Sequence, residues 1–217
     1  MRTRIKICCI SSIEEATLAI NHGADALGLV AKMPSGPGPI PDELIAEIAT
    51  YIPPPIASFL LTSEQSSENI IAHIKRVGTN TVQIVDELTE GAYKDIRLAL
   101  PNIKLVQVIH VTGEESIQQA IEVQDEIDAI LLDSGNPKAP IKTLGGTGNT
   151  HNWDISRDLV QAVKVPVFLA GGLNAGNVQQ AIQKVKPFGV DICSGVRTNG
   201  KLDAEKLEVF MKQVTQF

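Results

Sequence analysis

The chain has 217 residues, a hydrophobic fraction of 43%, and 19 Lys and Arg residues against 25 Asp and Glu residues, which gives a formal net charge of −6. This apolar content is enough for a substantial core and excludes a disordered chain, while the negative charge argues against nucleic acid as the main partner. No apolar run approaches the roughly 18 residues of a membrane-spanning helix, and the first residues lack the apolar region of a signal peptide. We expect a cytoplasmic protein with a single domain over residues 1–217 that binds neither membranes nor nucleic acid.

The chain contains three cysteines, of which Cys8 and Cys9 are adjacent and Cys193 is distant. An odd number at these positions does not make the disulfide framework of a secreted scaffold, so we expect free thiols in a reducing compartment. The three cysteines also lack the spacing of a metal-ligand motif, and we expect no metal.

Short apolar segments rich in β-branched residues recur along the whole chain, and amphipathic stretches separate them. Nearly continuous apolar strands are typical of a parallel sheet that is covered by helices. Eight strand and helix units in little more than 200 residues favour a closed (β/α)8 TIM barrel over a doubly wound sheet, which usually needs five or six strands. The expected strands begin near Arg4, Asp25, Pro55, Asn80, Ile103, Asp128, Pro166 and Gly189.

The expected helices have recognisable beginnings and ends. Ser12 with Glu15 fits a capping box at the start of the first helix, and Gly78 fits a left-handed cap at the end of the third. Two connections, residues 31–41 and 134–152, are longer than the usual two to six residues of a βα loop. Both follow strands at the carboxyl end of the barrel, which is where active sites of this fold lie.

Three Gly-rich segments in the second half of the chain follow strands 6, 7 and 8 and should meet at that end. Glycine allows backbone N–H groups to approach an anion closely, and the loops after strands 7 and 8 commonly bind phosphate. Glycines that only make tight turns are the alternative, but three segments on one face favour a phosphate site. The candidate residues are Gly145, Gly146, Thr147, Gly148, Gly171, Gly172, Ser194 and Gly195.

Several reactive side chains are expected at the same end. Side chains alternate along a strand, so Cys8 should point into the barrel and Cys9 outward against helices, although both could simply be small buried residues. Asp133 ends an apolar strand, where desolvation favours a protonated carboxyl; an Asp that caps the next turn is the alternative. Lys6 and Asp191 lie on neighbouring strands of a closed barrel and predict a buried ion pair.

These residues, in this order, resemble the phosphoribosylanthranilate isomerase family of tryptophan biosynthesis, and the resemblance covers nearly the whole chain. Its most specific part is the GGTG loop followed by a Trp, with AGGL and SGV after the later strands. The matching segments are Lys6-Ile7-Cys8, residues 23–28, Leu131-Leu132-Asp133, residues 145–154, the AGGLN segment, Val190-Asp191 and Ser194-Gly195-Val196.

The resemblance implies an Amadori rearrangement of a ribosylamine phosphate into a 1-amino-1-deoxyketose phosphate. By position, Asp133 would be the general acid that opens the furanose ring and Cys8 the general base that removes the C2′ proton. A thiol acts as a base only as the thiolate, which nearby positive charge favours. The glycine loops and Asp191 would contact the phosphorylated sugar, no cofactor is needed, and the protein would be a monomer or a homodimer.

The sequence departs from the family pattern at three places. Cys9 replaces the usual Gly after the strand 1 Cys, and Gln83-Ile84-Val85-Asp86 replaces the usual Gln-Leu-His-Gly. In the loop after strand 2, Pro37 stands where the family has an Arg that holds the anthranilate carboxylate, and Pro cannot supply a bidentate cation. Lys32 is the single cationic residue of that loop and is the expected carboxylate contact.

Three functions stay open. The first is phosphoribosylanthranilate isomerisation with the carboxylate met by another group, and the second is a paralogue that isomerises a different aminosugar phosphate, which the missing Arg favours. The third is a phosphate-binding barrel without turnover. Retention of both Cys8 and Asp133 favours the two enzymes over the third.

Overall fold

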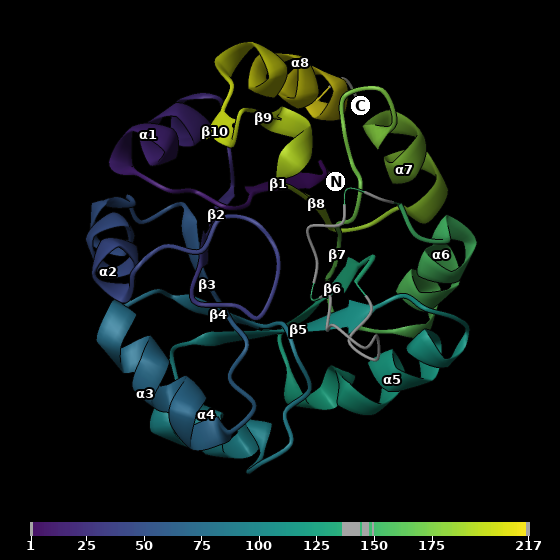
Figure 1. Ribbon diagram of the computed structural model, residues 1–217. Helices are drawn as coiled ribbons and strands as arrows, with labels where there is room; N and C mark the ends of the chain where they lie inside the picture. The colour runs from purple at the N-terminus through teal and green to yellow at the C-terminus, as the bar shows by residue number, and fades with distance from the viewer. Residues whose placement is uncertain (1, 136–143, 145–147, 149, 216–217) are drawn as a thin grey trace.

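The computed structural model describes residues 2–135, 144, 148 and 150–215. The eight strands that the sequence predicts are present, and they form a closed parallel barrel in which each strand pairs with the next and β8 pairs with β1 (Figure 1). The (β/α)8 prediction is confirmed. The strands are β1 (Arg4–Ile7), β2 (Ala26–Val30), β3 (Ala57–Thr62), β4 (Thr81–Ile84), β5 (Lys104–His110), β6 (Ala129–Asp133), β7 (Val167–Leu169) and β8 (Gly189–Ile192).

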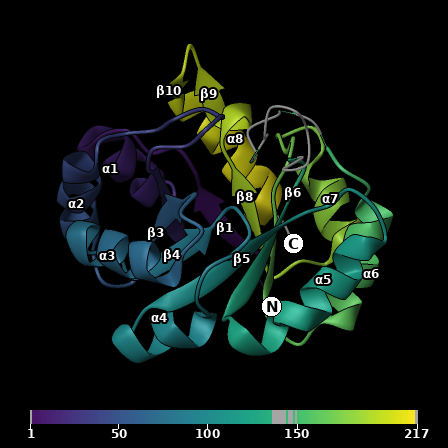
Figure 2. The same ribbon diagram turned by 60° about the horizontal axis from the view of Figure 1, so that its bottom comes forward.

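Among the described residues, α-helices follow the strands and form a ring around the barrel (Figures 1 and 2). Two 3-10 helices, η1 (Gln124–Glu126) and η2 (Ser194–Val196), and a short antiparallel hairpin of β9 (Arg197–Thr198) and β10 (Lys201–Leu202) complete the fold. The helices are α1 (Ile13–Asn21), α2 (Asp42–Tyr51), α3 (Ser67–Val77), α4 (Tyr93–Ala99), α5 (Glu115–Val123), α6 (Trp153–Ala162), α7 (Val178–Val185) and α8 (Ala204–Thr215).

Local sequence signals fix two of the helix ends. The Ser12 hydroxyl accepts a hydrogen bond from the backbone N–H of Glu15 at 3.2 Å, which satisfies one of the unpaired donors at the start of α1. Gly78 closes α3 with a φ of +72°, a conformation that costs glycine little. The predicted caps at Ser12 and Gly78 are confirmed, but the capping box is incomplete, because the Glu15 carboxylate accepts from the backbone N–H of Ser11 at 3.0 Å and not from that of Ser12.

The core has two layers because the barrel strands are buried on both faces. The larger layer fills the space between the strands and the helices. The smaller one fills the barrel interior. It includes Phe59 and Leu61 of β3 and Val106 and Val108 of β5; residues two apart on a strand have side chains on the same face. A polar pair, Lys6 and Asp191, interrupts this interior layer just below the carboxyl ends of the strands.

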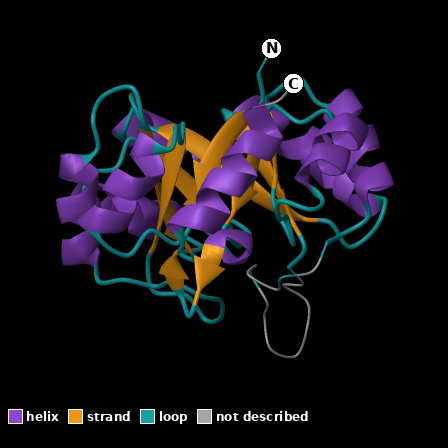
Figure 3. Ribbon diagram, turned by 90° about the horizontal axis from the view of Figure 1, so that it is seen from above, coloured by secondary structure: helices purple, strands orange, loops and turns teal. Residues whose placement is uncertain are grey.

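The two ends of the barrel differ in what covers them. The chain termini lie at one end, and the hairpin of β9 and β10 lies at the other (Figure 3). The connection between β2 and α2 also covers this second end, where Pro39 bridges to Val30. Within the described part of the chain, no helix is both long and apolar enough to cross a membrane.

Candidate active site

Two cavities of about 70 Å³ each open at the carboxyl end of the barrel. The first lies over β6, β7 and β8, and backbone of glycine residues forms much of its wall. Among the described lining residues there is no Lys or Arg, so an anion in this cavity would meet neutral donors, such as backbone N–H groups and the Ser194 hydroxyl, and no cationic side chain. Its lining consists of Asp133, Gly148, Ala170, Gly171, Gly172, Leu173, Asp191, Ile192, Cys193 and Ser194.

The two glycines after β7 are required by their backbone conformation. Gly171 has a φ of +82° and Gly172 a φ of +63°, both in the left-handed region. A Cβ on Gly171 would also lie 3.1 Å from Cβ of Ser134 and 3.2 Å from Nδ1 of His151. The chain therefore needs glycine here to turn after the strand and keep the cavity open.

The second cavity lies over β2 to β6 and under the loop of residues 31–41. Most of its wall is apolar, and no Lys or Arg is among the described residues that line it. A flat apolar group of modest size suits such a wall better than a second anion. Its lining consists of Cys9, Val30, Met33, Ser35, Gly36, Pro37, Leu61, Gln83, Val85, Val108, Leu131, Asp133, Leu144, Asp191 and Cys193.

Asp133, Asp191 and Cys193 line both cavities and mark the place where they meet. Burial raises the pKa of Asp133 above its usual range, against the opposing effects of the backbone N–H of Ser134, which donates to Oδ1 at 2.7 Å, and of His110. A carboxyl at the junction therefore holds its proton to higher pH than an ordinary Asp. It can donate that proton to a ligand that spans both cavities.

The predicted ion pair inside the barrel is confirmed. Lys6 is fully buried, and its Nζ lies 2.9 Å from Oδ1 of Asp191 and 5.3 Å from the centre of the Phe59 ring. Burial opposes the charged form of both groups, but the attraction of Asp191 keeps the pKa of Lys6 above its usual value. The barrel interior therefore carries one fixed ammonium beneath the junction of the cavities.

Cys8 points into the barrel, as the strand alternation predicts. A Cβ on Gly28 of β2 would lie 2.8 Å from Sγ of Cys8 and 3.0 Å from Nζ of Lys6, so the thiol and the ammonium occupy the same small region. Cys8 is 6% exposed and, among the described residues, belongs to the interior cluster rather than to the lining of either cavity. Gly28 is needed here because any larger residue would fill the space of the thiol.

The prediction that Cys9 packs outward against helices is wrong. Strand β1 ends at Ile7, and Cys9 has a φ of +62°, which ends the alternation and turns its side chain toward the second cavity. Its thiol donates to the carbonyl of Pro37 at 3.6 Å. Hydrogen bonding with the thiols of Cys193 and Cys8, together with burial, raises the pKa of Cys9, so this thiol stays neutral.

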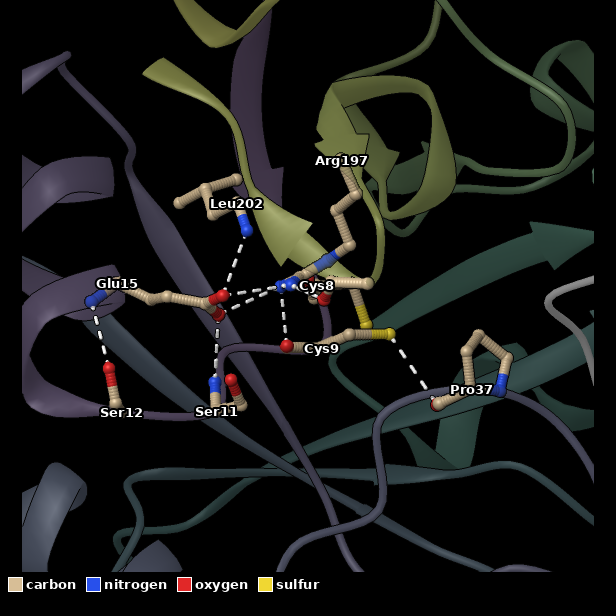
Figure 4. A network of polar contacts seen from close by, with 9 residues as sticks. Cys8, Cys9, Ser11, Ser12, Glu15, Pro37, Arg197 and Leu202 are labelled. Carbon is tan, nitrogen blue, oxygen red and sulfur yellow. Dashed lines mark hydrogen bonds and ion pairs between the residues drawn. The ribbon is translucent and has the colours of Figure 1, made fainter.

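Arg197, which sequence reasoning did not single out, contacts the segment that directly follows β1 (Figure 4). Its guanidinium donates to the carbonyls of Cys8 at 3.2 Å and Cys9 at 2.5 Å, and to both carboxylate oxygens of Glu15 at 3.0 and 3.1 Å. Glu15 in turn accepts from the backbone N–H groups of Ser11 and Leu202. The β9–β10 hairpin is thus joined to the segment that carries both thiols.

The other predicted residues divide into three groups. Gly148, Gly171, Gly172, Asp191 and Ser194 line the first cavity, as expected. Gly195 does not, because its Cα faces the Leu173 carbonyl, where a Cβ would collide. Lys32 is exposed and is not among the described residues of the second cavity. Gly145, Gly146 and Thr147 lie outside the described residues.

Together, these features define an α/β barrel with two adjacent cavities, one lined partly by glycines and one largely apolar, with an acid that lines both and a thiol beneath them. The family model for N-(5′-phosphoribosyl)anthranilate isomerase matches residues 5–213, and the chain belongs to this family. The resemblance noted from the sequence is confirmed.

Individual relatives agree with this assignment. The N-(5′-phosphoribosyl)anthranilate isomerase of Methanocella arvoryzae is 32% identical over 213 residues, which are 98% of each chain. The crystal structure of the Thermotoga maritima phosphoribosyl anthranilate isomerase superposes with a TM-score of 0.82 at 29% identity and covers 99% of this chain and all of that one. A phosphoribosyl anthranilate isomerase solved in complex with reduced 1-(o-carboxyphenylamino)-1-deoxyribulose 5-phosphate has a TM-score of 0.79 at 27% identity, with 99% and 100% coverage.

Proposed function

We propose that this protein catalyses the Amadori rearrangement of N-(5′-phosphoribosyl)anthranilate to 1-(2-carboxyphenylamino)-1-deoxyribulose 5-phosphate. The observation that carries the proposal is the junction of two unlike cavities at Asp133, a carboxyl whose pKa is raised by burial. The substrate has the same order of parts, namely a phosphate, a sugar that must be protonated and an aromatic ring. A simple phosphate-binding barrel would need only the first cavity.

The phosphate would lie in the first cavity. Gly171, Gly172 and Ser194 line it from the loops after β7 and β8, and glycine permits the close backbone approach that an anion requires. The undescribed glycines of residues 145–147 belong to the same proposal, since they precede Gly148 in the chain.

Asp133 would act as the general acid. Its proton passes to the furanose ring oxygen, the bond between C1′ and that oxygen breaks, and the anthranilate nitrogen supplies the electron pair for a cationic Schiff base. Asp191, which shares the junction, is already paired with Lys6 and holds the ammonium in place. The two carboxyls thus take different roles because their partners differ.

Cys8 would act as the general base. As a thiolate it removes the C2′ proton of the Schiff base, which gives an enolamine that tautomerises to the ketone. The Lys6 ammonium shares the region of the Cys8 thiol, and the cationic Schiff base adds a second positive charge during the reaction. The neighbouring Cys9 thiol stays neutral and is a poorer base. The chemistry needs no cofactor.

The aromatic ring would lie against the apolar wall of the second cavity. Its carboxylate needs a donor, and Pro37 lines the cavity where the family pattern has an Arg. Lys32, the one cation of residues 31–41, is exposed at the start of this loop and would meet the carboxylate at the cavity rim as a point charge.

Complementation of a tryptophan auxotroph that lacks this isomerase tests the activity, with turnover of phosphoribosylanthranilate by the purified protein as the second measurement. Growth and turnover support the proposal. The position of Pro37 favours one other candidate, an isomerase for a different aminosugar phosphate. If the protein supports neither growth nor turnover of phosphoribosylanthranilate but isomerises another aminosugar phosphate, this second candidate replaces the first.

A further inference from the structure

Gln83 is a buried amide at the second cavity whose carbonyl oxygen has no hydrogen-bond donor among the described residues. The residue lies on β4 between Leu61 of β3 and Val106 of β5, and its side chain faces the barrel interior. It is only 3% exposed, and its Oε1 is buried without a hydrogen-bond donor from the part of the chain that the structure describes. An unsatisfied buried carbonyl is costly, and in a native structure it usually marks a place that a ligand or water fills.

Gln107, on the next strand, shows what a structural glutamine looks like in this barrel. It is also buried, but its Nε2 donates to the carbonyls of Ile84, Asp86 and Val108, and its Oε1 accepts from the hydroxyl of Tyr93 at 2.8 Å. The amide of Gln107 therefore works within the fold. The carbonyl of Gln83 has no such donor among the described residues, and Gln83 lines the second cavity.

The position of Gln83 indicates which part of a ligand it meets. Gln83 lines the second cavity but not the first, whereas Asp133 lines both. If the phosphate occupies the first cavity and the sugar lies at Asp133, the next atom toward the apolar wall is the nitrogen that links the sugar to the ring. That nitrogen carries an N–H, which is a donor that a carbonyl oxygen can accept.

We infer that Gln83 is a substrate-contacting residue whose Oε1 accepts a hydrogen bond from the arylamine N–H of the substrate. This inference rests on the proposed function and assigns a residue to the aglycone end of the site. Gln83 thereby positions the nitrogen over the apolar cavity. It also favours an amine-linked aglycone over an ether-linked one, which would leave Oε1 unpaired.

The test compares Gln83→Met with Gln107→Met, because the change is the same and only the partners differ. The probe is reduced 1-(o-carboxyphenylamino)-1-deoxyribulose 5-phosphate, titrated calorimetrically into the full-length protein. We expect Gln83→Met to weaken its binding roughly tenfold, the equivalent of one neutral hydrogen bond. Inorganic phosphate, which would use only the first cavity, should inhibit wild type and Gln83→Met equally.

Stability separates a ligand contact from a structural role. Gln83→Met should leave the urea midpoint unchanged or raise it, since it removes an unsatisfied polar group, while Gln107→Met should lower it. A lower midpoint for Gln83→Met with unchanged binding would show that water satisfies Oε1 and would overturn the inference. Equal loss of affinity for ribulose 5-phosphate, which has the hydroxyls but no amine, would also overturn it.

The outcomes also distinguish this inference from the proposed function. Wild-type protein that neither binds the probe nor turns over phosphoribosylanthranilate overturns both. Wild-type protein that does both, together with a Gln83→Met variant that binds the probe as tightly, overturns the role of Gln83 alone.

Discussion

The guanidinium of Arg197 lies between the carboxylate of Glu15 and the carbonyl of Cys9, to which it donates at 2.5 Å. Glu15 and Arg197 are 182 residues apart in the chain, and both side chains are largely buried. Cys9 has a left-handed backbone conformation that a non-glycine residue adopts at a cost. Arg197 therefore stabilises the strained backbone of Cys9, the residue that directly follows the proposed base, Cys8.

Arg197→Met should destabilise the protein by about 1.5 to 3 kcal/mol, because it removes the charged hydrogen bonds to the Glu15 carboxylate. Burial alone would raise the pKa of Glu15, but Arg197 and the backbone N–H of Leu202 hold it below its usual range. The stability that the ionised Glu15 contributes is present above pH of about 4, and it is lost as pH falls through the lowered pKa of Glu15. Urea unfolding should therefore show the largest loss at neutral pH. An Arg197→Met protein of wild-type stability contradicts this role, and Glu15→Leu combined with Arg197→Met should recover part of the loss.

Cys8→Ser should reduce kcat by about 10² to 10⁴-fold with a small change in KM, because it removes the base and leaves both cavities intact. Cys9→Ser is the matched control, since this thiol stays neutral and only lines the second cavity. It should retain kcat within a few fold. Steady-state kinetics on phosphoribosylanthranilate decide between the two thiols, and the reverse result would assign the base to Cys9.

Asp133→Asn should abolish turnover and yet stabilise the fold at neutral pH. Burial raises the pKa of Asp133 above the value of about 3.9 in an unfolded chain, so the folded protein retains a proton that the unfolded chain releases. The resulting stability is complete below pH of about 4 and is lost as pH rises through the raised pKa, whereas Asn does not ionise. The gain in unfolding free energy should therefore be small at pH 4 and larger at pH 7. A variant less stable than wild type at pH 7 would mean that the carboxylate is needed by the fold.

The barrel could be predicted from the sequence because strands buried on both faces are continuous apolar runs, as in Leu29 to Val30 or Ile130 to Leu132. The pairing of Lys6 with Asp191 could be predicted because a closed barrel places β8 beside β1, and the alternation of side chains along both strands then directs the two residues to the same face. Asp133 was predictable for a similar reason, as a carboxyl at the end of an apolar strand.

The rest depended on features that local patterns do not carry. Cys9 turns inward because β1 ends two residues earlier, at Ile7. The alternation of side chains along a strand does not indicate at which residue the strand ends. Arg197 has no local motif, and its partners come from the opposite end of the chain. Gln83 did leave a signal, because alternation on β4 places it on the same face as Val85 inside the barrel, where an amide is out of place.

Gly171→Ala should weaken phosphate binding. The left-handed φ of +82° costs an alanine about 1 kcal/mol, and its Cβ would press on Ser134 and His151, which shifts the wall of the first cavity. We expect KM for the substrate and the inhibition constant of inorganic phosphate to rise together, several-fold or more. An unchanged inhibition constant would place the phosphate elsewhere.

Gly38→Ala should act on the second cavity alone. Gly38 has a φ of +83°, and a Cβ there would lie 2.6 Å from Cβ of Cys9, so the loop of residues 31–41 must move away from β1. That loop supplies Met33, Ser35, Gly36 and Pro37 to the cavity wall. KM for phosphoribosylanthranilate should therefore rise, while the inhibition constant of phosphate stays as in wild type.

Gly78→Ala is the control for the effect of backbone conformation in Gly38→Ala. Gly78 also has a left-handed φ, +72°, but no atom of the described residues lies within 4 Å of the position that its Cβ would take. It should lose about 1 kcal/mol of unfolding free energy and keep wild-type kinetics. Gly38→Ala should lose more stability than this, because strain and collision with Cys9 add. Both variants could lose the same unfolding free energy while Gly38→Ala keeps the wild-type KM. In that case the loop of residues 31–41 shifts at no energetic cost, and the contact between Gly38 and Cys9 does not shape the aglycone site.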